Sequence, residues 1–256
     1  MSIPTENCPG EKRKAFLALV STPIGNLSDI TFRAVETLKQ SDIVAAEDTR
    51  RAKILLDRYE IRVELISYHA HNEHRKTDEI LELVLSGKNV SMLSDAGTPS
   101  ISDPGYLICS RAIEKGISPL IIPGVSALTF AVTACGLPVD KFAFHGFLPV
   151  KQGRRMAALQ KIASEDRTSF VFESPHRILK LINEISTVLG PETRIAIIRE
   201  ATKLYEEIMR GTAGDISEKE KNRSWKGECT VAIFKESPAK KRGNHFFDNF
   251  FKIGLF

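Results

Sequence analysis

A ligand-binding loop is predicted at residues 94–105, where small, hydroxyl-bearing and turn-forming residues follow one another as SDAGTPSISDPG. The loop joins a short apolar run, typical of a buried strand, to a pattern typical of a helix. Gly97 and Gly105 allow backbone conformations that other residues avoid, and Pro99 and Pro104 stiffen the path between them. Turns contain such residues in any protein, but a loop of this length is uncommon as a plain connection. We therefore expect its backbone groups and hydroxyls to bind a ligand at the carboxyl end of a sheet.

Charged residues and histidines follow two further predicted strands. The sequence EDTR at residues 47–50 follows an apolar run, and Asp48 within it is a natural N-cap for the next helix. The loop at residues 69–74 holds three histidines. No carboxylate or thiol spacing completes a metal site around them, so we expect hydrogen bonds to RNA or substrate and no bound metal.

The turns after other strands argue against the common phosphate-binding loops. Residues 16–20 form the first predicted strand, and the turn after it contains Pro23 and Gly25 but neither Gly-x-Gly-x-x-Gly nor Gly-Lys-Ser/Thr. A dinucleotide or nucleoside triphosphate site of the usual kind is therefore not expected. The sequence PGVSA at residues 123–127 begins another helix, whose free N–H groups can bind a carboxylate or a carbonyl-like acceptor.

The elements that position these loops alternate between strand and helix along the first half of the chain, which predicts an α/β domain with a largely parallel sheet. A second α/β unit is predicted from further strands at residues 142–147, 168–172, 194–198 and 226–234. The predicted organisation is a disordered leader at residues 1–14, an N-terminal domain at 15–137, a C-terminal domain at 138–236, and a basic, aromatic tail at 237–256.

Composition limits the class of protein. The 256 residues are 42% hydrophobic and 27% charged, with a net charge of +4, which suits a soluble globular protein and permits a nucleic-acid partner without requiring one. The four cysteines are scattered, so we expect no disulfides, no zinc site and a cytoplasmic location. Residues 116–139 carry no charge and are long enough to span a bilayer, but prolines and glycines divide them, and we expect buried α/β core and no membrane segment.

Eight motifs, taken in order, resemble one family: the small-subunit ribosomal RNA cytidine-2′-O-methyltransferases of the tetrapyrrole-methylase superfamily. The resemblance covers roughly residues 15–234. The motifs are TPIGNL at 22–27, EDTR at 47–50, SDAGTP at 94–99, SDPG at 102–105, PGVSA at 123–127, GFLP at 146–149, ESPHR at 173–177 and REATK at 199–203.

This resemblance implies two α/β domains with S-adenosylmethionine in the cleft between them, and a homodimer. It implies that the substrate is the small ribosomal subunit with its 16S rRNA, methylated on the ribose 2′-hydroxyl of a decoding-region cytidine. The cofactor contacts of the superfamily would fall on Pro23, Gly97, Thr98, Ile101, Ser126 and Ala127, with Glu173 and Ala201 closing the site from the second domain.

The chain departs from the family pattern at three places. Ala201 stands where the family usually has leucine, which is expected to loosen that wall of the pocket. Cys229 and Thr230 replace the usual apolar pair after Lys-Gly-Glu. The phenylalanine-rich tail has no counterpart, and its role is left open.

Methyl transfer of this kind is an in-line displacement in which the protein mainly positions the reactants. The ribose hydroxyl is a poor nucleophile at neutral pH, so a general base would help. We favour Lys203, together with Glu173, as the catalytic pair; Lys203 can accept a proton only if burial lowers its pKa, and otherwise it would bind phosphate. The other candidate bases are Glu47, Asp48, His69, Asp103 and Glu207.

RNA contacts are expected from basic and histidine side chains in both domains. Phosphate contacts supply affinity but little sequence choice, and the target base would be splayed out of its helix. We therefore expect an assembled small subunit to be the substrate. The residues expected to bind RNA are Arg50, His69, Arg154, Arg155 and Arg177, with Arg51, Lys53 and Lys151 beside them.

Two alternatives remain open from the sequence. One is a tetrapyrrole methyltransferase on the same fold, although EDTR and ESPHR favour the RNA branch. The other is a non-catalytic RNA-binding or ribosome-assembly factor with an inherited pocket, although every pocket-forming motif is present.

Overall fold

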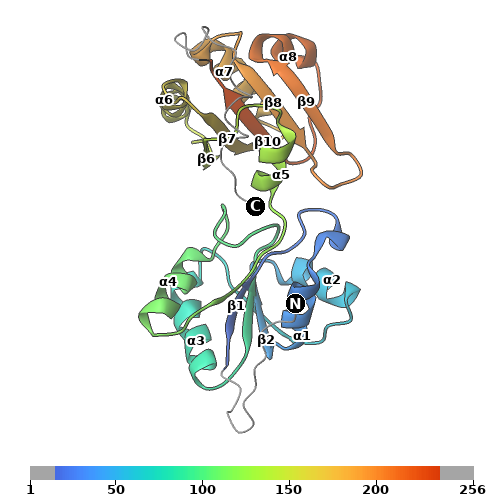
Figure 1. The fold of residues 1–256 in the computed structure, drawn as a ribbon, viewed down its shortest axis with the longest axis vertical. Coiled ribbons are helices and arrows are strands. Elements are labelled where there is room, and N and C mark those ends of the chain that lie inside the picture. The colour runs from blue at the N-terminus through green and yellow to red at the C-terminus, as the bar shows by residue number, and fades with distance from the viewer. Residues whose placement is uncertain (1–14, 237–256) are drawn as a thin grey trace, which may run out of the picture. The chain divides into compact units, whose positions relative to one another are not determined.

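The computed structural model describes residues 15–236, which form two compact units that divide between Thr129 and Phe130 (Figure 1). The division falls within helix α5 (Ala127–Ala134), before the boundary expected from the sequence at residues 137 and 138. The predicted leader (residues 1–14) and tail (237–256) lie outside the described residues.

Unit 1 is built on a five-stranded sheet in which every pairing is parallel, as the alternation of strands and helices predicts. The strand order is β3-β2-β4-β1-β5. The strands are β1 (Leu17–Val20), β2 (Ile43–Ala46), β3 (Glu64–Ser67), β4 (Val90–Leu93) and β5 (Leu120–Ile122).

Helices cover both faces of this sheet because successive side chains of the buried strands point to opposite faces. Leu17 and Leu19 of β1 join a hydrophobic cluster with α3 (Glu73–Leu85) and α4 (Tyr106–Glu114). Ala18 and Val20 join a second cluster, which includes residues of α1 (Phe32–Lys39) and α2 (Thr49–Arg58). A short 3-10 helix, η1 (Leu27–Asp29), precedes α1.

The helices that follow β1 and β4 lie on opposite faces of the sheet, α1 on one and α4 on the other. Because β1 and β4 are neighbours, the loops at their carboxyl ends run in opposite directions. A crevice is expected between such loops, and this is where open α/β sheets bind ligands. The predicted ligand loop, residues 94–105, leaves β4 at this point.

Unit 2 has a mixed five-stranded sheet in the order β6-β7-β10-β8-β9, in which β6 and β7 are parallel and the other pairings antiparallel. The cluster of α6, α7 and α8 residues packs on one face of it. Strand β9 and helices α6 and α8 were not predicted; β9 is an edge strand whose residues are only half-buried or exposed, so it lacks a buried alternating pattern. The elements are β6 (Phe142–Phe147), α6 (Gln152–Ala163), β7 (Thr168–Glu173), α7 (Ile178–Leu189), β8 (Arg194–Arg199), β9 (Glu207–Thr212), α8 (Ala213–Glu220) and β10 (Cys229–Phe234).

Candidate functional site

The loops after β1 and β4 are joined through their backbones at the carboxyl edge of the unit 1 sheet. Thr22 N donates to Gly97 O at 2.9 Å, and Gly97 N donates to Thr22 O at 3.0 Å. The hydroxyl of Thr22 donates to Ser94 O at 3.0 Å, and that of Ser94 donates to Gly97 O at 2.8 Å. Three of these hydrogen bonds therefore fix the start of the predicted ligand loop against the turn that follows β1, and the fourth closes the loop on itself.

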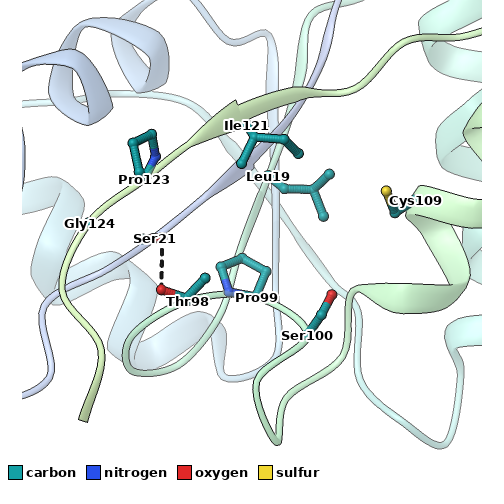
Figure 2. A pocket seen from close by; sticks show the side chains of 9 residues that line it. All are labelled: Leu19, Ser21, Thr98, Pro99, Ser100, Cys109, Ile121, Pro123 and Gly124. Carbon is teal, nitrogen blue, oxygen red and sulfur yellow. Dashed lines mark hydrogen bonds between the residues drawn. The ribbon is translucent and has the colours of Figure 1, made fainter. Parts of the chain in front are cut away.

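The hydroxyl of Thr98 connects these two loops to the third, which follows β5. Ser21 Oγ donates to Thr98 Oγ1 at 3.3 Å, a bond drawn as the dashed line in Figure 2. Thr98 Oγ1 in turn donates to Val125 O at 3.4 Å, and Ser21 N donates to Ile122 O at 3.0 Å. Three strand ends that are far apart in sequence therefore meet at the Thr98 side chain.

The second half of the loop holds a strained backbone. Ser100 and Ser102 have φ angles of 71° and 64°, in the left-handed region that non-glycine residues rarely adopt. Gly105 has a φ of 149°, and a Cβ at that position would lie 2.6 Å from Ser100 Oγ, so only glycine fits there. Strain of this kind costs about 1–3 kcal/mol per residue and concentrates at ligand sites.

A cavity of about 180 Å³ opens beside these loops (Figure 2). It has no charged side chain in its lining, which combines apolar surface with three hydroxyl-bearing residues, so it suits an uncharged, partly apolar group. Its volume is below the roughly 300–1,000 Å³ of pockets that enclose a whole drug-sized ligand, so it would hold only part of such a molecule. It is lined by Leu19, Ser21, Thr98, Pro99, Ser100, Cys109, Ile121, Pro123 and Gly124.

Of the residues predicted to contact the cofactor, Thr98 lines this cavity directly. Gly97 lies against the backbone of Ser126, since a Cβ on Gly97 would be 3.7 Å from Ser126 Cα. Ile101 N donates to Thr98 O at 3.2 Å. Pro23 follows the turn residue Thr22, and Ala127 begins α5, whose first turn is capped by Ser126 Oγ accepting from Leu128 N.

Five of the nine lining residues belong to segments that the sequence predicted to bind a ligand, residues 94–105 and 123–127, and the other four were not predicted. Ser21 comes directly after β1, so the carboxyl-end rule could have found it. Leu19, Cys109 and Ile121 lie within strands or a helix and are typical core residues in sequence. Only the packing of α4 against the sheet reveals that they border a cavity.

Acidic residues occupy the same sheet edge after β2 and β4. Asp95 Oδ1 accepts from Asp48 N at 2.8 Å, and Asp48 caps α2 as predicted, accepting from Arg50 N at 2.9 Å. Burial raises the pKa of the Glu47 carboxyl, and the charge of Asp95 adds to the shift, while the neighbouring His69 and Arg51 partly offset it. Arg50, predicted to bind RNA, has 88% of its side chain exposed and is paired with Asp48.

In unit 2, Glu173 ends β7 with a side chain only 1% exposed. Its Oε1 accepts from Arg177 at 2.7 Å and from Ser174 N at 2.7 Å. Its Oε2 is buried without a hydrogen-bond partner among the described residues. Glu173 and Arg177, predicted as a catalytic and an RNA-binding residue, therefore form one ion pair.

Arg155 does not have the surface position that RNA binding requires, so that prediction is corrected. Its guanidinium is 3% exposed and binds both carboxylate oxygens of Glu184, at 2.6 and 2.7 Å. A third nitrogen donates to the backbone oxygens of Pro149 and Val150. The residue therefore joins α6 to α7 and to the GFLP turn. The neighbouring Arg154 is exposed, as RNA binding requires.

Lys203 lies in the loop after β8, where Glu200 and Thr202 have φ angles of 51° and 66°. Its Nζ donates to Glu200 and to Glu228, both at 2.9 Å. Burial alone lowers the pKa of Lys203, but these two carboxylates outweigh it, and the net shift is upward. The condition under which Lys203 could act as a base is therefore not met, because the structure keeps the ammonium protonated.

The residues that depart from the family pattern lie in this region of unit 2. Cys229 is buried, and burial raises the pKa of its thiol to about 12, so it is not a reactive thiolate. In the sheet, Cys229 of β10 lies opposite Glu173 of β7 on one side and opposite Arg199 of β8 on the other. Ala201 is half-buried in the strained loop.

Within residues 15–236, no three His, Cys, Asp or Glu side chains are grouped so that they could bind a metal. In the same range, no helix combines the length and apolar character needed to cross a bilayer. The uncharged segment at residues 116–139 contains β5 and α5, as predicted, but it is not the buried core that was expected, because Leu120 and Ile121 of β5 are 43% and 55% exposed.

Comparison with known proteins identifies the fold and its relatives. Residues 17–217 match the family of tetrapyrrole (corrin/porphyrin) methylases. "Ribosomal RNA small subunit methyltransferase I" of Synechocystis sp. is 46% identical over 196 residues, covering 77% of this chain and 70% of the relative. The protein of the same name in Thermotoga maritima is 44% identical over 218 residues, covering 85% and 97%.

Solved structures show the same fold at lower identity. Uroporphyrin-III-C-methyltransferase from Thermus thermophilus has a TM-score of 0.61 at 19% identity, with 86% of this chain and 94% of that chain covered. A diphthine synthase has a TM-score of 0.66 at 17% identity, with 86% and 90% covered. The two α/β domains predicted from the sequence are confirmed; the cofactor cleft between them stays a prediction.

Proposed function

The chain belongs to the tetrapyrrole methylase family, and from this premise we propose that it methylates the ribose 2′-hydroxyl of a decoding-region cytidine in small-subunit rRNA. The observation that carries the proposal is the identity of 40–47% to proteins named as small-subunit ribosomal RNA methyltransferases, over about 80% of the chain. The tetrapyrrole enzymes among the solved structures share less than 20% identity, which supports the fold and not their substrate.

S-adenosylmethionine is the methyl donor that fits this site. The cavity at the carboxyl edge of unit 1 carries no charge and offers hydroxyls and backbone groups, which suits a cofactor that has no phosphate. We expect Thr98 and Ser21 to bind it by their hydroxyls, and Gly97, Ile101, Ser126 and Pro23 to shape the surrounding backbone. When bound, the cofactor supplies a methyl group activated by a sulfonium.

The residues of the chain act mainly by positioning. In the reaction an O–C bond forms, a C–S bond breaks and the hydroxyl proton leaves. Alignment of two reactants can supply about 7–11 kcal/mol of the barrier, so the strained, hydrogen-bonded loop at residues 94–105 is expected to contribute most. Glu173 holds Arg177, and Lys203 acts as a cation that orders the loop after β8.

The proposal is tested by incubating the protein with labelled S-adenosylmethionine and one of three acceptors. These are small ribosomal subunits that lack the modification, a short naked oligonucleotide of the target sequence, and a tetrapyrrole precursor. We expect label in the subunits alone, on a ribose oxygen. Label in the tetrapyrrole would establish the other branch of the family, and binding of subunits without labelling would identify a non-catalytic factor.

The role of Lys203 is tested separately with Lys203→Ala and Lys203→Arg under single-turnover conditions with saturating subunits. We expect Lys203→Arg to keep most of the rate, since a cation suffices, and Lys203→Ala to lower it. Normal methylation by Lys203→Ala would remove Lys203 from the catalytic machinery. A homodimer is part of the same proposal, and light scattering of the purified protein measures it.

A further inference from the structure

The outer faces of the two helix pairs of unit 1 differ in charge. Helices α1 and α2 carry six basic and two acidic residues: Arg33, Lys39, Arg50, Arg51, Lys53 and Arg58 against Glu36 and Asp57. Helices α3 and α4 carry three basic and five acidic ones: Arg75, Lys76 and Arg111 against Glu73, Asp78, Glu79, Glu82 and Glu114. We call the six basic side chains on α1 and α2 the α1–α2 basic face.

The two faces also differ in how their cations are neutralised. On α3 and α4 each lysine and arginine is paired with a carboxylate, as in the contacts of Arg75 with Glu79 and of Arg111 with Asp78. On the α1–α2 basic face, Arg50 pairs with Asp48 and Arg51 approaches Asp95 at 3.8 Å. The other four have no carboxylate within ion-pair distance in the described part of the chain. Their charge is available to an anionic partner.

The positions of three arginines on this face oppose helix stability. Arg33 lies in the first turn of α1, and Arg50 and Arg51 lie in the first turn of α2; neither turn contains an acidic residue. The amino end of a helix carries partial positive charge, so cations there are unfavourable and carboxylates favourable. Helix α3 follows the favourable pattern with Glu73 in its first turn. Selection for helix stability alone does not account for the arginines.

The face begins at the carboxyl edge of the unit 1 sheet, on the side of the sheet opposite the cavity, which Leu19 and Cys109 line from the α3–α4 side. Helices α1 and α2 start after the carboxyl ends of β1 and β2, so their first turns lie at the sheet edge that bears the ligand loops. Both pack on the same cluster, and Figure 1 shows them together on one side of the sheet. Phe32, at the start of α1, is 92% exposed and offers a ring on which an unpaired base can stack.

From these observations we infer that the α1–α2 basic face is the surface that binds the phosphate backbone of the substrate RNA. The inference deepens the proposed function and rests on it. Unpaired cations along two helices complement a chain of phosphates, and an exposed aromatic ring beside them suits RNA better than an acidic protein surface. Arg33, Lys39 and Arg58 are thereby added to the RNA-binding residues.

The test compares two variants that lose the same charge. One removes three cations from the face by Arg33→Gln, Lys39→Gln and Lys53→Gln. The matched control removes three from the opposite side of unit 1 by Arg75→Gln, Lys76→Gln and Lys115→Gln. Affinity for small ribosomal subunits is measured over a series of salt concentrations, and calorimetry with S-adenosylmethionine confirms that each variant keeps the cofactor site.

We expect the slope of log affinity against log salt to become shallower by about two to three units in the first variant, because each lost phosphate contact changes it by roughly 0.7–0.9. The control is expected to keep the wild-type slope. A wild-type slope in the first variant, or an equal change in both, would overturn the inference. The same change is expected with protein-free ribosomal RNA; if only intact subunits show it, the face contacts ribosomal protein and the assignment to RNA fails.

Failure of the proposed function gives a different result. Wild-type protein that binds subunits through this face, but transfers no label to them, would remove the methyltransferase activity and keep the RNA surface. Labelling of subunits by both variants at wild-type affinity would keep the activity and remove the surface.

Discussion

The loop after β4 in unit 1 and the loop after β8 in unit 2 adopt similar strained backbones but are stabilised in different ways. Each places two non-glycine residues at left-handed φ angles, Ser100 and Ser102 in the first and Glu200 and Thr202 in the second. The first loop is held by hydroxyls and backbone groups, as in the bond from Ser94 Oγ to Gly97 O. The second is held by charges, above all Lys203 between Glu200 and Glu228.

The difference suits the two loops to different tasks. The first loop carries Asp95, which contacts Asp48 and Arg51, but its hydroxyls and backbone groups face the cavity, and the lining of that cavity has no charged side chain. The stability of a loop held by ion pairs depends on salt and pH. Such a loop also requires that the surrounding sheet hold the charged side chains in place. In unit 2 the ends of four strands supply that arrangement, since Glu173, Cys229, Arg199 and Glu207 are consecutive register partners. Four variants test this contrast, from the largest expected effect to the smallest.

The largest effect is expected from the buried pair in unit 2. Glu184→Leu leaves the Arg155 guanidinium buried without its carboxylate, which we expect to destabilise unit 2 by about 3–5 kcal/mol. Hydrogen exchange read separately in the two units measures it, and unit 1 should be unaffected. The double variant Arg155→Met with Glu184→Leu, in which no charge is left unpaired, should recover most of the loss. A loss below about 1 kcal/mol in the single variant would show that unit 2 does not depend on this pair.

Gly227→Ala is expected to have the next largest effect. Gly227 has a φ of 84°, and an added Cβ would overlap the carboxyl group of Glu200. Gly87→Ala in unit 1 is the matched control, because Gly87 has a φ of 100° with nothing within 4 Å of the added Cβ. Both variants incur a backbone cost of about 1–2 kcal/mol, because an L side chain is strained at positive φ. Thermal unfolding should show a further loss of about 1–3 kcal/mol for Gly227→Ala, and equal losses would mean that Glu200 moves freely away from the glycine.

Thr98→Val tests the neutral loop of unit 1. The change removes the hydroxyl that links Ser21 to Val125 O, at a cost of about 1 kcal/mol. Because this hydroxyl also lines the cavity, calorimetry should show weaker S-adenosylmethionine binding by roughly tenfold. Thr98→Ser keeps the hydroxyl and serves as the control. Unchanged cofactor affinity in Thr98→Val would place the cofactor elsewhere.

The smallest effect is expected on the stability of unit 2 at low pH. Hydrogen bonds from Arg223, with that from Arg199, lower the pKa of Glu207 to about 2 from an ordinary 4.5. A carboxyl whose folded pKa is lowered stabilises the fold above its unfolded pKa, and that stability is lost as the pH falls from about 4.5 toward 2. The side chain is partly exposed, so the effect should stay below about 1 kcal/mol.

Unfolding of unit 2 followed by hydrogen exchange between pH 5 and pH 2 measures this dependence. The variant Glu207→Gln should have a flatter pH profile than the wild type. An unchanged profile in Glu207→Gln would assign the acid sensitivity to other carboxylates. Added salt should weaken the loop after β8 more than the loop after β4, because ion pairs are screened and neutral hydrogen bonds are not.

The sequence predicted the elements of unit 1 well because its signals are local. Buried parallel strands are short apolar runs, and each ends in small or charged residues that must lie at one edge of the sheet. Asp48 as N-cap and residues 94–105 as a loop after a strand follow from such local rules, and both are confirmed. In unit 2 the same rules missed α6, β9 and α8; β9 was missed because an edge strand with half-buried residues has no clear apolar period.

The predicted site residues also divide into those that local sequence signals indicate and those that depend on distant partners. The loop that carries Gly97 and Thr98 was predicted because the position of a strand end follows from local pattern, whereas the assignment of these two residues to the cofactor follows from the family resemblance and stays a prediction. The roles of charged residues were harder to predict, since they depend on partners far away in sequence. The partner of Arg155 is Glu184 on another helix, α7. The partner of Lys203 is Glu228, which lies just before β10.

By itself, the sequence determined the order of elements in unit 1, the two α/β domains and most of the loops that form the candidate cofactor site. Only the tertiary structure decided which charges are buried and which remain available. Arg154 and Arg155 are adjacent in sequence, yet one is exposed and the other is enclosed between α6 and α7. The reason is that one residue along a helix turns the side chain by about 100°, and the neighbours that it then meets come from segments whose positions only folding fixes.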